Sequence, residues 1–407
     1  MNKSYYKFFI IPCVLFLISC GNKTQTNTSE SNEQSQSEPV FLPEIKNLTV
    51  TDNGHFTDAQ LGYLSKDTYD NTDPYCGNMS VSAPKPIVLS WEGNLDHYYV
   101  YLFSDIERSK KIISYDVGTA TTFEFFNGQL GKTYHWDVRG IINGNSEVMY
   151  GSSASSFTVS IGEHPGPRNL NIEGVENFRD LGGWGYFDES GNYKTYIKQG
   201  MIYRSGRFNE DKQTEPVASI TENGLKEVNK LLKIKTEIDL RRTSNNEVGG
   251  LTDKSVLGDN VKYYQLPMYY GGRNILTFNE TISGDTYNYD NPAMIKNFFE
   301  ILADENNYPI DFHCSIGKDR TGCLAYLVEA LLGFDQETLY RDYMFTNFAN
   351  AGYCKITDIT DNNRYGKTLA DYENGININE KTYNYLHEVI GLSTDTLNRV
   401  ISILGNN

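Results

Sequence analysis

The residues with the clearest chemical potential lie in one stretch, residues 313–322, which reads His-Cys-Ser-Ile-Gly-Lys-Asp-Arg-Thr-Gly. Backbone N–H groups in a tight, glycine-bearing loop converge on one point, and the start of a following helix adds partial positive charge. Arg320 carries a planar fork that can hold two oxygens of a phosphate. The same positive field would depress the pKa of Cys314 and keep it as a thiolate. The stretch therefore predicts an anion-binding loop with a nucleophile at its mouth.

The segments on either side predict the elements that hold this loop. The apolar run 308–312 predicts a strand, and the apolar run from Cys323 to Leu332, closed by Gly333, predicts a helix. The spacing of cysteine and arginine alone also fits a buried cysteine at a strand end beside a surface arginine. The complete stretch in a strand–loop–helix context favours the phosphate-binding interpretation.

Each residue of the loop has an expected role. We expect Cys314 to attack phosphorus and Arg320 to hold the non-bridging oxygens together with the loop backbone. His313 is expected to brace the loop rather than to transfer protons, because neighbouring residues on a strand point to opposite sides. Thr321 can donate to the thiolate or to the loop. The phosphate-binding residues expected on this basis are Ser315, Ile316, Gly317, Lys318 and Thr321.

A second motif, residues 177–183, reads Asn-Phe-Arg-Asp-Leu-Gly-Gly, and residues 204–206 read Arg-Ser-Gly. Alone, the motif could be a turn beside a surface arginine. Together with the loop, it resembles the bacterial branch of tyrosine and phosphoinositide phosphatases in the cysteine-dependent phosphatase superfamily. The resemblance covers about residues 167–404. It implies an α/β phosphatase domain that needs no metal or cofactor. It also implies supporting positions at the edge of the site for Asn177, Arg179, Asp180 and Arg204.

The leaving group needs a proton donor, and here the sequence departs from the family pattern. In relatives of this branch an aspartate can follow the proline after the strand that corresponds to 261–266. Here residues 266–270 read Leu-Pro-Met-Tyr-Tyr, without a carboxylate. The candidates are Asp319 in the loop and Asp285 or Asp290 in the segment 269–291. We favour Asp319 because the loop puts it near the substrate; its alternative role is to fix the loop by hydrogen bonds.

Composition limits the partners. The net charge of −16 argues against non-specific binding of nucleic acid and against electrostatic docking on anionic lipid. The six cysteines form no close pair, and the six histidines have no ligand spacing. Lys318 adds positive charge at the rim of the loop, which is compatible with polyanionic or lipid substrates or with a merely exposed charge. Phosphotyrosine proteins and phosphoinositides therefore both remain open as substrates.

Alternating strands and helices predict an α/β layered domain over residues 163–407. Thr221 is the expected N-cap of its first helix, the segment 269–291 is expected to be an irregular substrate-facing lid, and residues 353–376 are expected to be irregular. The expected strands are 200–207, which ends in a polar turn, 234–240, 261–266 and 308–312. The expected helices are 221–232, 292–303, 323–332, 335–345, 380–390 and 394–404.

An all-β sandwich is predicted over residues 41–162. Alternation places Tyr134, Trp136 and Val138 on one face. This module resembles a fibronectin type III domain, on the basis of Trp91 and of Leu130 four residues before Tyr134. Residues 50–82 fit that pattern poorly. A spacer or packing partner is favoured over a binding role. The expected strands are 87–91, 98–103, 111–117, 121–126, 133–142 and 156–160.

The N-terminus reads as a lipoprotein signal peptide, residues 1–19, with two early lysines and a short apolar run. The sequence Leu-Ile-Ser-Cys-Gly at 17–21 resembles a bacterial lipobox, which makes Cys20 the expected lipidation site. Residues 20–40 are polar and predict a disordered tether. We therefore expect a lipid-anchored, extracytoplasmic protein of the bacterial cell envelope. The alternative function is a surface binding or adhesion lipoprotein with a vestigial phosphatase domain.

Overall fold

The computed structural model describes residues 44–52, 54–66, 83–142, 148–209, 220–242, 247, 252–349 and 353–406. The predicted signal peptide, Cys20 and the tether lie outside the described residues. Within the described part of the chain, no helix has the length and apolar content needed to cross a membrane.

The β module, residues 45–158, consists of two antiparallel sheets that share one apolar core. The predicted alternation in strand β6, Thr133–Ile141, is confirmed, because Tyr134, Trp136 and Val138 are almost completely buried. Strands β1, Ile45–Asp52, and β7, Tyr150–Gly151, were not predicted. One sheet has the order β1-β2-β5, formed by Ile45–Asp52, Ile87–Gly93 and Thr122–Phe125. The other has the order β4-β3-β6-β7, formed by Lys111–Gly118, His97–Phe103, Thr133–Ile141 and Tyr150–Gly151, with β8, Ser155–Thr158, paired to β6.

Helix α1, Asp58–Leu64, lies between β1 and β2 in the sequence but contributes to a different core. The ring of Tyr63 packs against Phe345 and Phe348, and its hydroxyl donates to the carbonyl of Arg341. This explains why the segment 50–82 did not fit a sandwich pattern. Its described helix is built into the α/β domain instead.

The α/β domain is organised on a six-stranded sheet with the order β15-β14-β18-β13-β10-β9. The four strands from β15 to β13 are parallel, and β10 and β9 continue the sheet in antiparallel fashion. Strand β18 is therefore hydrogen-bonded to a parallel strand on each side, β13 and β14. These two neighbours fix the position of the loop that begins at its end. The strands are β9 Arg168–Asn169, β10 Arg179–Asp180, β13 Ile202–Ser205, β14 Thr236–Asp239, β15 Lys262–Gln265 and β18 Ile310–His313.

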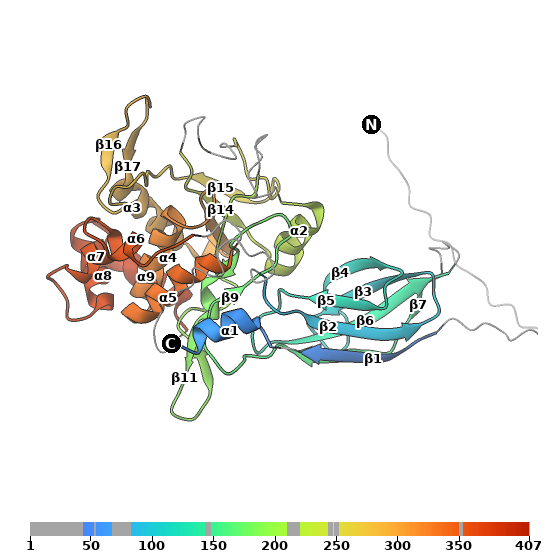
Figure 1. The fold of residues 1–407 in the computed structure, drawn as a ribbon. Coiled ribbons are helices and arrows are strands. Elements are labelled where there is room, and N and C mark those ends of the chain that lie inside the picture. The colour runs from blue at the N-terminus through green and yellow to red at the C-terminus, as the bar shows by residue number, and fades with distance from the viewer. Residues whose placement is uncertain are drawn as a thin grey trace, which may run out of the picture. The chain divides into compact units, whose positions relative to one another are not determined.

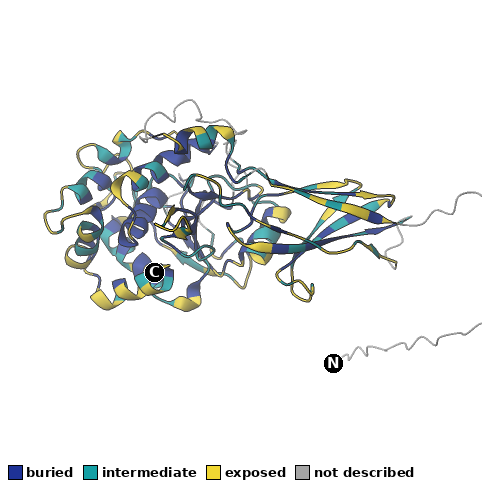
Figure 2. Cartoon of the chain, turned by 90° about the horizontal axis from the view of Figure 1, so that it is seen from below, coloured by how far each residue is buried: buried dark blue, intermediate teal, exposed yellow. Residues whose placement is uncertain are grey.

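Helix α4, Arg320–Leu331, follows β18 and is the centre of the domain, because all 12 of its residues are buried. It contacts β13 and β18 on one side and α5 and α8 on the other. Helix α4 and the helices that follow it in the chain gather on one side of this sheet (Figure 1), and the dark, buried residues lie inside this group (Figure 2). Other helices of the domain are α2 Glu222–Glu227, α3 Asn291–Leu302, α5 Gln336–Phe345, α8 Ile378–Glu388 and α9 Thr394–Leu404.

Most predicted elements are present, with shifted ends. Thr221 caps α2 as expected, since its hydroxyl accepts from the N–H of Gly224 at 3.2 Å. Two segments expected to be irregular are so only in part, although residues 270–275 of the first line the cavity beside the loop as expected. The segment 269–291 contains a hairpin of β16, Asn279–Thr281, and β17, Asn288–Asp290. The segment 353–376 contains α6, Thr357–Thr360, and α7, Tyr365–Ala370.

The β module and the α/β domain are joined through polar contacts around Arg168. Arg168 donates to the carbonyls of Gly128 and Asn127, at 2.9 and 3.0 Å, and forms a buried ion pair with Asp180. Glu227 of α2 accepts hydrogen bonds from Tyr115 and Asn127 of the module. The module is therefore a packing partner of the α/β domain rather than a spacer.

Candidate active site

The loop after β18 has the tight turn that its glycine predicted. Gly317 has a φ of +69°, and a Cβ at this position would lie 2.5 Å from the carbonyl oxygen of Ser205. Only glycine adopts this conformation without strain and fits against the neighbouring strand. The chain then enters α4 at Arg320, three residues earlier than predicted. The loop backbone and the first turn of α4 together form the predicted cradle.

Cys314 lies at the base of this cradle and is 2% exposed. Burial alone would raise the pKa of its thiol, but the charge of Arg320 and hydrogen bonding from Thr321 outweigh burial, so the pKa lies below its usual value. The Thr321 hydroxyl is buried beside the sulfur and helps to lower the pKa of Cys314. The site thus favours the thiolate form of Cys314 more than an ordinary cysteine environment does.

Arg320 is held in place by Glu247. One terminal nitrogen, Nη1, donates to Glu247 at 2.9 Å and to the Leu240 carbonyl at 3.0 Å, and Nη2 donates to the other Glu247 oxygen. The Nε of Arg320 is buried and has no partner among the described residues. That N–H and the second hydrogen of Nη2 remain available for two phosphate oxygens. The ring of Tyr270 lies over the guanidinium, 4.7 Å from its centre.

Glu247 also connects the two ends of the loop, because Ser315 donates its hydroxyl to Glu247 at 2.5 Å. Burial would raise the pKa of Glu247, but Arg320 and the Ser315 hydroxyl lower it to about 2. Sequence reasoning assigned no role to this residue. Glu247 lies in a polar stretch of the sequence without a helix or strand pattern, so nothing there indicated a buried position.

The supporting residues of the second motif reach the loop in two ways. Asn177 donates directly, through its amide, to the carbonyls of Ile316 at 3.2 Å and Gly317 at 3.0 Å. Arg204 also donates directly to the Gly317 carbonyl, at 2.8 Å, and pairs with Asp342 at 2.6 Å. Arg179 acts one step further away, since it pairs with Asp342 at 3.2 Å and donates to the Thr346 hydroxyl at 3.0 Å.

Asp342 is a second residue that sequence reasoning missed. It lies on α5, forms ion pairs with Arg204 and Arg179, and accepts a hydrogen bond from the indole N–H of Trp184. The sequence did contain a signal for this residue, because Asp342 lies between Leu339 and Tyr343 on the apolar side of a helix. A buried charge at such a position indicates a charged partner.

Asp180 corrects one expectation. The motif placed it at the edge of the site, but its carboxylate faces away from the loop. It pairs with Arg168 and accepts from the N–H groups of Gly182 at 2.9 Å and Gly200 at 2.7 Å. Arg179 and Asp180 are consecutive on β10, and consecutive side chains on a strand point to opposite faces. Asp180 therefore supports the turn after β10 and the contact with the β module.

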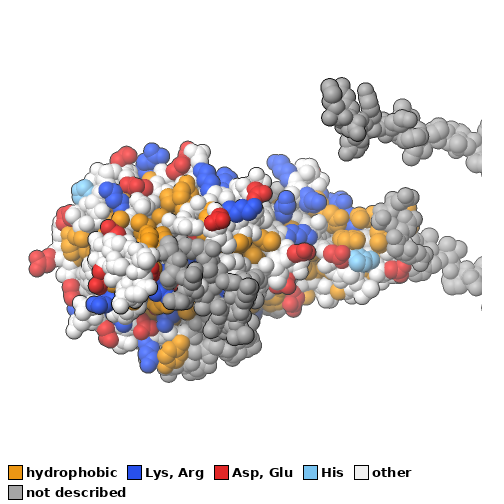
Figure 3. Space-filling model, turned by 90° about the horizontal axis from the view of Figure 1, so that it is seen from above, with side chains coloured by type: hydrophobic (Ala, Val, Ile, Leu, Met, Phe, Trp, Pro, Cys, Tyr) orange, Lys and Arg blue, Asp and Glu red, His pale blue; other side chains and the backbone are white. Residues whose placement is uncertain are grey.

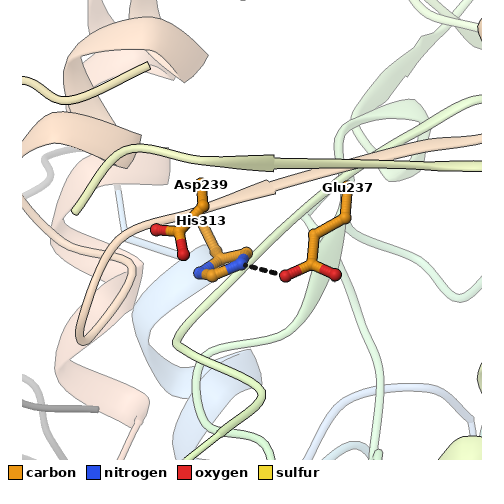
Figure 4. A group of neighbouring side chains, drawn as sticks. All are labelled: Glu237, Asp239 and His313. Atoms are coloured by element: carbon orange, nitrogen blue, oxygen red, sulfur yellow. Dashed lines mark hydrogen bonds and ion pairs between the residues drawn. The ribbon is translucent and has the colours of Figure 1, made fainter. Parts of the chain in front are cut away.

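His313 is completely buried beneath the loop, in contact with Glu237 and near Asp239 (Figure 4). Its Nε2 lies 3.0 Å from Glu237, and its Nδ1 lies 3.2 Å from the Cys314 carbonyl. Burial would lower its pKa, but Asp239 and Glu237 raise it to about 9. With both ring nitrogens bearing protons, His313 can donate in both directions and anchor the loop to β14.

His313, Glu237 and Asp239 also have the donor types of a metal site, with ligand atoms within 4.8 Å of one another. The ligand atoms are, however, committed to hydrogen bonds. Glu237 accepts from Ser255, and Asp239 accepts from Arg241 and from the Tyr263 hydroxyl. The arrangement fits a brace for the loop.

Lys318 and Asp319 line a cavity of about 270 Å³ beside the cradle. Lys318 donates to the Tyr353 carbonyl at 2.5 Å and lies 3.5 Å from Asp358. Burial raises the pKa of Asp319, and the nearby charges of Lys318 and Arg320 only partly offset it. A carboxyl that faces a cavity next to the nucleophile and holds its proton more tightly than usual has the properties of a proton donor. The other residues that line this cavity are Tyr270, Gly272, Arg273, Ile275, Tyr343, Asp358, Arg364 and Tyr365.

The two rival acids have other roles in the structure. Asp285 accepts from the Tyr289 hydroxyl at 2.6 Å, and this hydrogen bond lowers its pKa. Asp290 caps α3 by accepting from the N–H of Ala293 at 3.0 Å. Neither residue lines the cavity. The geometry therefore supports Asp319 over both.

A low-pKa thiol, a glycine-shaped cradle and a fixed arginine define a cysteine-dependent phosphate-ester site. Residues 170–405 match the model of a family described as the tyrosine phosphatase family. Because the match covers more than half of the chain, the chain belongs to the tyrosine phosphatase family.

Individual proteins show more distant similarity. The chain is 24% identical, over 205 residues, to a Cupriavidus necator protein with a provisional name as a tyrosine-protein phosphatase. That match covers 46% of this chain and 66% of the relative, slightly less than two thirds of its length. The core catalytic domain of the PP-IP phosphatase SIW14 from S. cerevisiae is 20% identical, with a TM-score of 0.25. This likeness covers 38% of this chain and 76% of that one. A redesigned β-sandwich protein is 13% identical, with a TM-score of 0.20, covering 30% of this chain and 96% of that one.

Proposed function

We propose that this protein hydrolyses phosphate monoesters through a phosphocysteine intermediate. The observation that carries the proposal is the Cys314 thiol, whose pKa is lowered by Arg320 within a loop shaped to hold an anion. A thiolate at the base of an anion cradle is positioned to attack a bound phosphoryl group.

The reaction would proceed in two balanced steps. In the first, the Cys314 sulfur forms a bond to phosphorus while the bond from phosphorus to the ester oxygen breaks, and Asp319 gives its proton to the departing oxygen. In the second, Asp319 takes a proton from water as the water oxygen bonds to phosphorus and the sulfur–phosphorus bond breaks. Arg320 and the loop N–H groups hold the phosphoryl oxygens throughout.

The proposed substrates are phosphotyrosine proteins, phosphoinositides or both. The cavity beside the cradle supports either choice, because aromatic side chains such as Tyr270 and Tyr343 and the cation of Lys318 line it together. We further propose that the protein is a lipid-anchored lipoprotein of the bacterial envelope, from the Leu-Ile-Ser-Cys-Gly sequence at residues 17–21. The two-sheet β module is proposed to be of fibronectin type III type. The coherent site argues against a vestigial domain on an adhesion lipoprotein.

The test uses purified protein without residues 1–20. It should hydrolyse p-nitrophenyl phosphate in the presence of EDTA, and vanadate should inhibit it. Cys314→Ser should abolish turnover, while Cys323→Ser, a near-isosteric change of a second buried thiol whose pKa burial raises, should retain it in protein that is still folded. Unchanged turnover in Cys314→Ser would disprove the mechanism.

A further inference from the structure

A second cavity, of about 280 Å³, lies between residues 169–179 and the end of helix α5, and no step of the proposed reaction uses it. We call it the motif cavity, because Asn177 and Arg179 of the motif 177–183 line it. It shares no lining residue with the cavity beside the cradle. The motif cavity is therefore a separate candidate binding site, and its size suits a small molecule.

Two buried polar atoms belong to residues that line this cavity, and both lack a partner. The side-chain oxygen of Asn169, a residue that is 5% exposed, accepts no hydrogen bond within the part of the chain that the structure describes. The Nε of Arg179, a residue that is 2% exposed, donates none there. The two residues are directly opposite each other on strands β9 and β10, so their side chains are neighbours on one face of the sheet. Buried polar atoms are normally paired, so this couple indicates a missing ligand.

The rest of Arg179 is held in place, which fixes the direction of its unpaired N–H. Its Nη1 donates to the Asp342 carbonyl at 2.8 Å, and its Nη2 donates to the Thr346 hydroxyl at 3.0 Å. The planar guanidinium cannot turn its Nε elsewhere without breaking these bonds. The backbone of Asn169 is likewise held by its pairing with Arg179. The donor and the acceptor are therefore organised before any ligand arrives, which lowers the entropic cost of binding.

The two unpaired atoms define the chemistry of the ligand. An amide group fits them, because its N–H can donate to the Asn169 oxygen while its oxygen accepts from the Arg179 Nε. Glu173 and Glu176 line the same cavity, and their negative charges disfavour an anion. The surface elsewhere has a different character, since Figure 3 shows acidic and basic side chains interspersed over one face of the molecule. The apolar residues that line the motif cavity suit an apolar substituent; they include Leu170, Ile172, Val175, Phe178 and Phe345.

We propose that the motif cavity binds a small uncharged amide with an apolar substituent, and that this ligand strengthens the phosphate-binding loop. Two supports of the loop begin at the cavity. Asn177 donates directly to the Gly317 carbonyl at 3.0 Å. Arg179 pairs with Asp342, which pairs with Arg204, and Arg204 donates to the same carbonyl at 2.8 Å. Binding of the amide is independent of the proposed phosphatase function, whereas its effect on turnover rests on that function.

Isothermal titration calorimetry with N-acetyl-leucinamide tests the binding. The wild-type protein should bind this probe with a Kd of about 1 mM, which is the affinity that its small size allows. N-acetyl-leucine, which has the same shape but carries a carboxylate, should bind about tenfold more weakly or not at all. With the amide bound, the Kd for vanadate should fall by about fivefold, at the lower end of typical coupling between two sites. The Kd for the amide should fall by the same factor when vanadate is bound, because such coupling is reciprocal.

Asn169→Leu removes the acceptor at nearly constant volume and should weaken amide binding by about tenfold. Because the Asn169 oxygen has no partner, this variant should unfold at no lower urea concentration than the wild type. Asn398→Leu, the same exchange at an exposed position of α9 outside the motif cavity, is the matched control and should keep the wild-type Kd. Val175→Phe, which fills part of the cavity from a partly exposed position, should also weaken binding and serves if Asn169→Leu does not fold.

The possible results separate the inference from the proposed function. No binding of the amide to the wild type would overturn the inference, and the motif cavity would then hold water alone. The same Kd in the wild type and Asn169→Leu would overturn it too, as would equal affinity for the amide and the carboxylate. Binding of the amide without a change in vanadate affinity would disprove the link to the loop. Absence of turnover with every phosphate ester would overturn the proposed function and leave the binding result standing.

Discussion

The side-chain amide of Asn177 donates to the carbonyl oxygen of Gly317 at 3.0 Å, although 140 residues separate the two. This bond fixes the one residue of the loop with a left-handed backbone. Asn177 itself has a φ of +55°, so two uncommon backbone conformations support each other. The two sequence motifs therefore form one structural unit.

Asn177→Ala should loosen the loop without removing a reacting group. We expect kcat/KM to fall by roughly tenfold to a hundredfold, because small displacements from reactive geometry are costly. Vanadate affinity should fall with it, since vanadate occupies the same cradle. Asn192→Ala, in an exposed turn, is the control. If vanadate binding were unchanged in Asn177→Ala, the bond would not position the loop.

Asp319→Asn tests the proton donor. Burial raises the pKa of Asp319, so the protonated form persists to higher pH than for an ordinary aspartate, and kcat should fall as pH rises through that pKa. Asp319→Asn should lower kcat by about 10²- to 10⁴-fold for a phenyl phosphate, less for p-nitrophenyl phosphate, and remove this limb of the pH profile. Asp285→Asn should keep the limb. If the limb were lost in Asp285→Asn instead, Asp285 would be the proton donor.

Glu247→Gln separates two effects of one carboxylate. Without the negative charge, Arg320 should lower the pKa of Cys314 further, so alkylation by iodoacetamide should proceed at lower pH. At the same time Arg320 loses its fixed partner, and kcat should fall by roughly tenfold or more. A purely structural role would leave the alkylation profile unchanged. A Cys314 pKa that rises in this variant would contradict the proposed balance of charges.

Glu227→Gln should change how stability depends on pH. Burial raises the pKa of Glu227 to about 7 from 4.5, although Tyr115 and Asn127 donate to it. Between these values the folded state keeps a proton that the unfolded state has lost, so stability should fall as pH rises through this window. The free energy of unfolding should fall by about 3 kcal/mol across this window.

Urea unfolding from pH 5 to pH 8 measures this dependence. The amide introduced by Glu227→Gln keeps an acceptor for Asn127 and should remove most of the pH dependence. Glu222→Gln, an exposed change in the same helix, should leave the dependence as in the wild type. The same slope in wild type and Glu227→Gln would exclude this contact as its source.

The strand, the loop and the helix after it could be predicted from the sequence because their signals are contiguous there. The apolar run to His313 and the glycine-bearing stretch after it are local signals, and the structure has both elements. The role of Glu247 could not be predicted, because its meeting with Arg320 depends on tertiary folding across 73 residues.

Helices α6 and α7 escaped prediction for a different reason. They have 4 and 6 residues, too few to show a helical period or to form without tertiary contacts. Burial of Ile359, Tyr365 and Leu369 in the main core holds them in place. Asp180 was placed at the edge of the site because the whole motif was assigned to one place. Arg179 and Asp180 are neighbours on a strand, however, so their side chains point to opposite faces.

Because α4 is completely buried, its sequence can change less than the sequences of the segments around the cavity beside the cradle. A substitution on α4 that changes side-chain volume disturbs the core, and one at Arg320 or Thr321 also disturbs the cradle, so this helix can tolerate little variation. The hairpin 279–290 and the helices at 357–370 carry or adjoin cavity residues and have more exposed positions. Substrate preference can therefore diverge by exchange of these peripheral segments while the bond-breaking step is inherited unchanged, and they are the natural targets for redesigning selectivity.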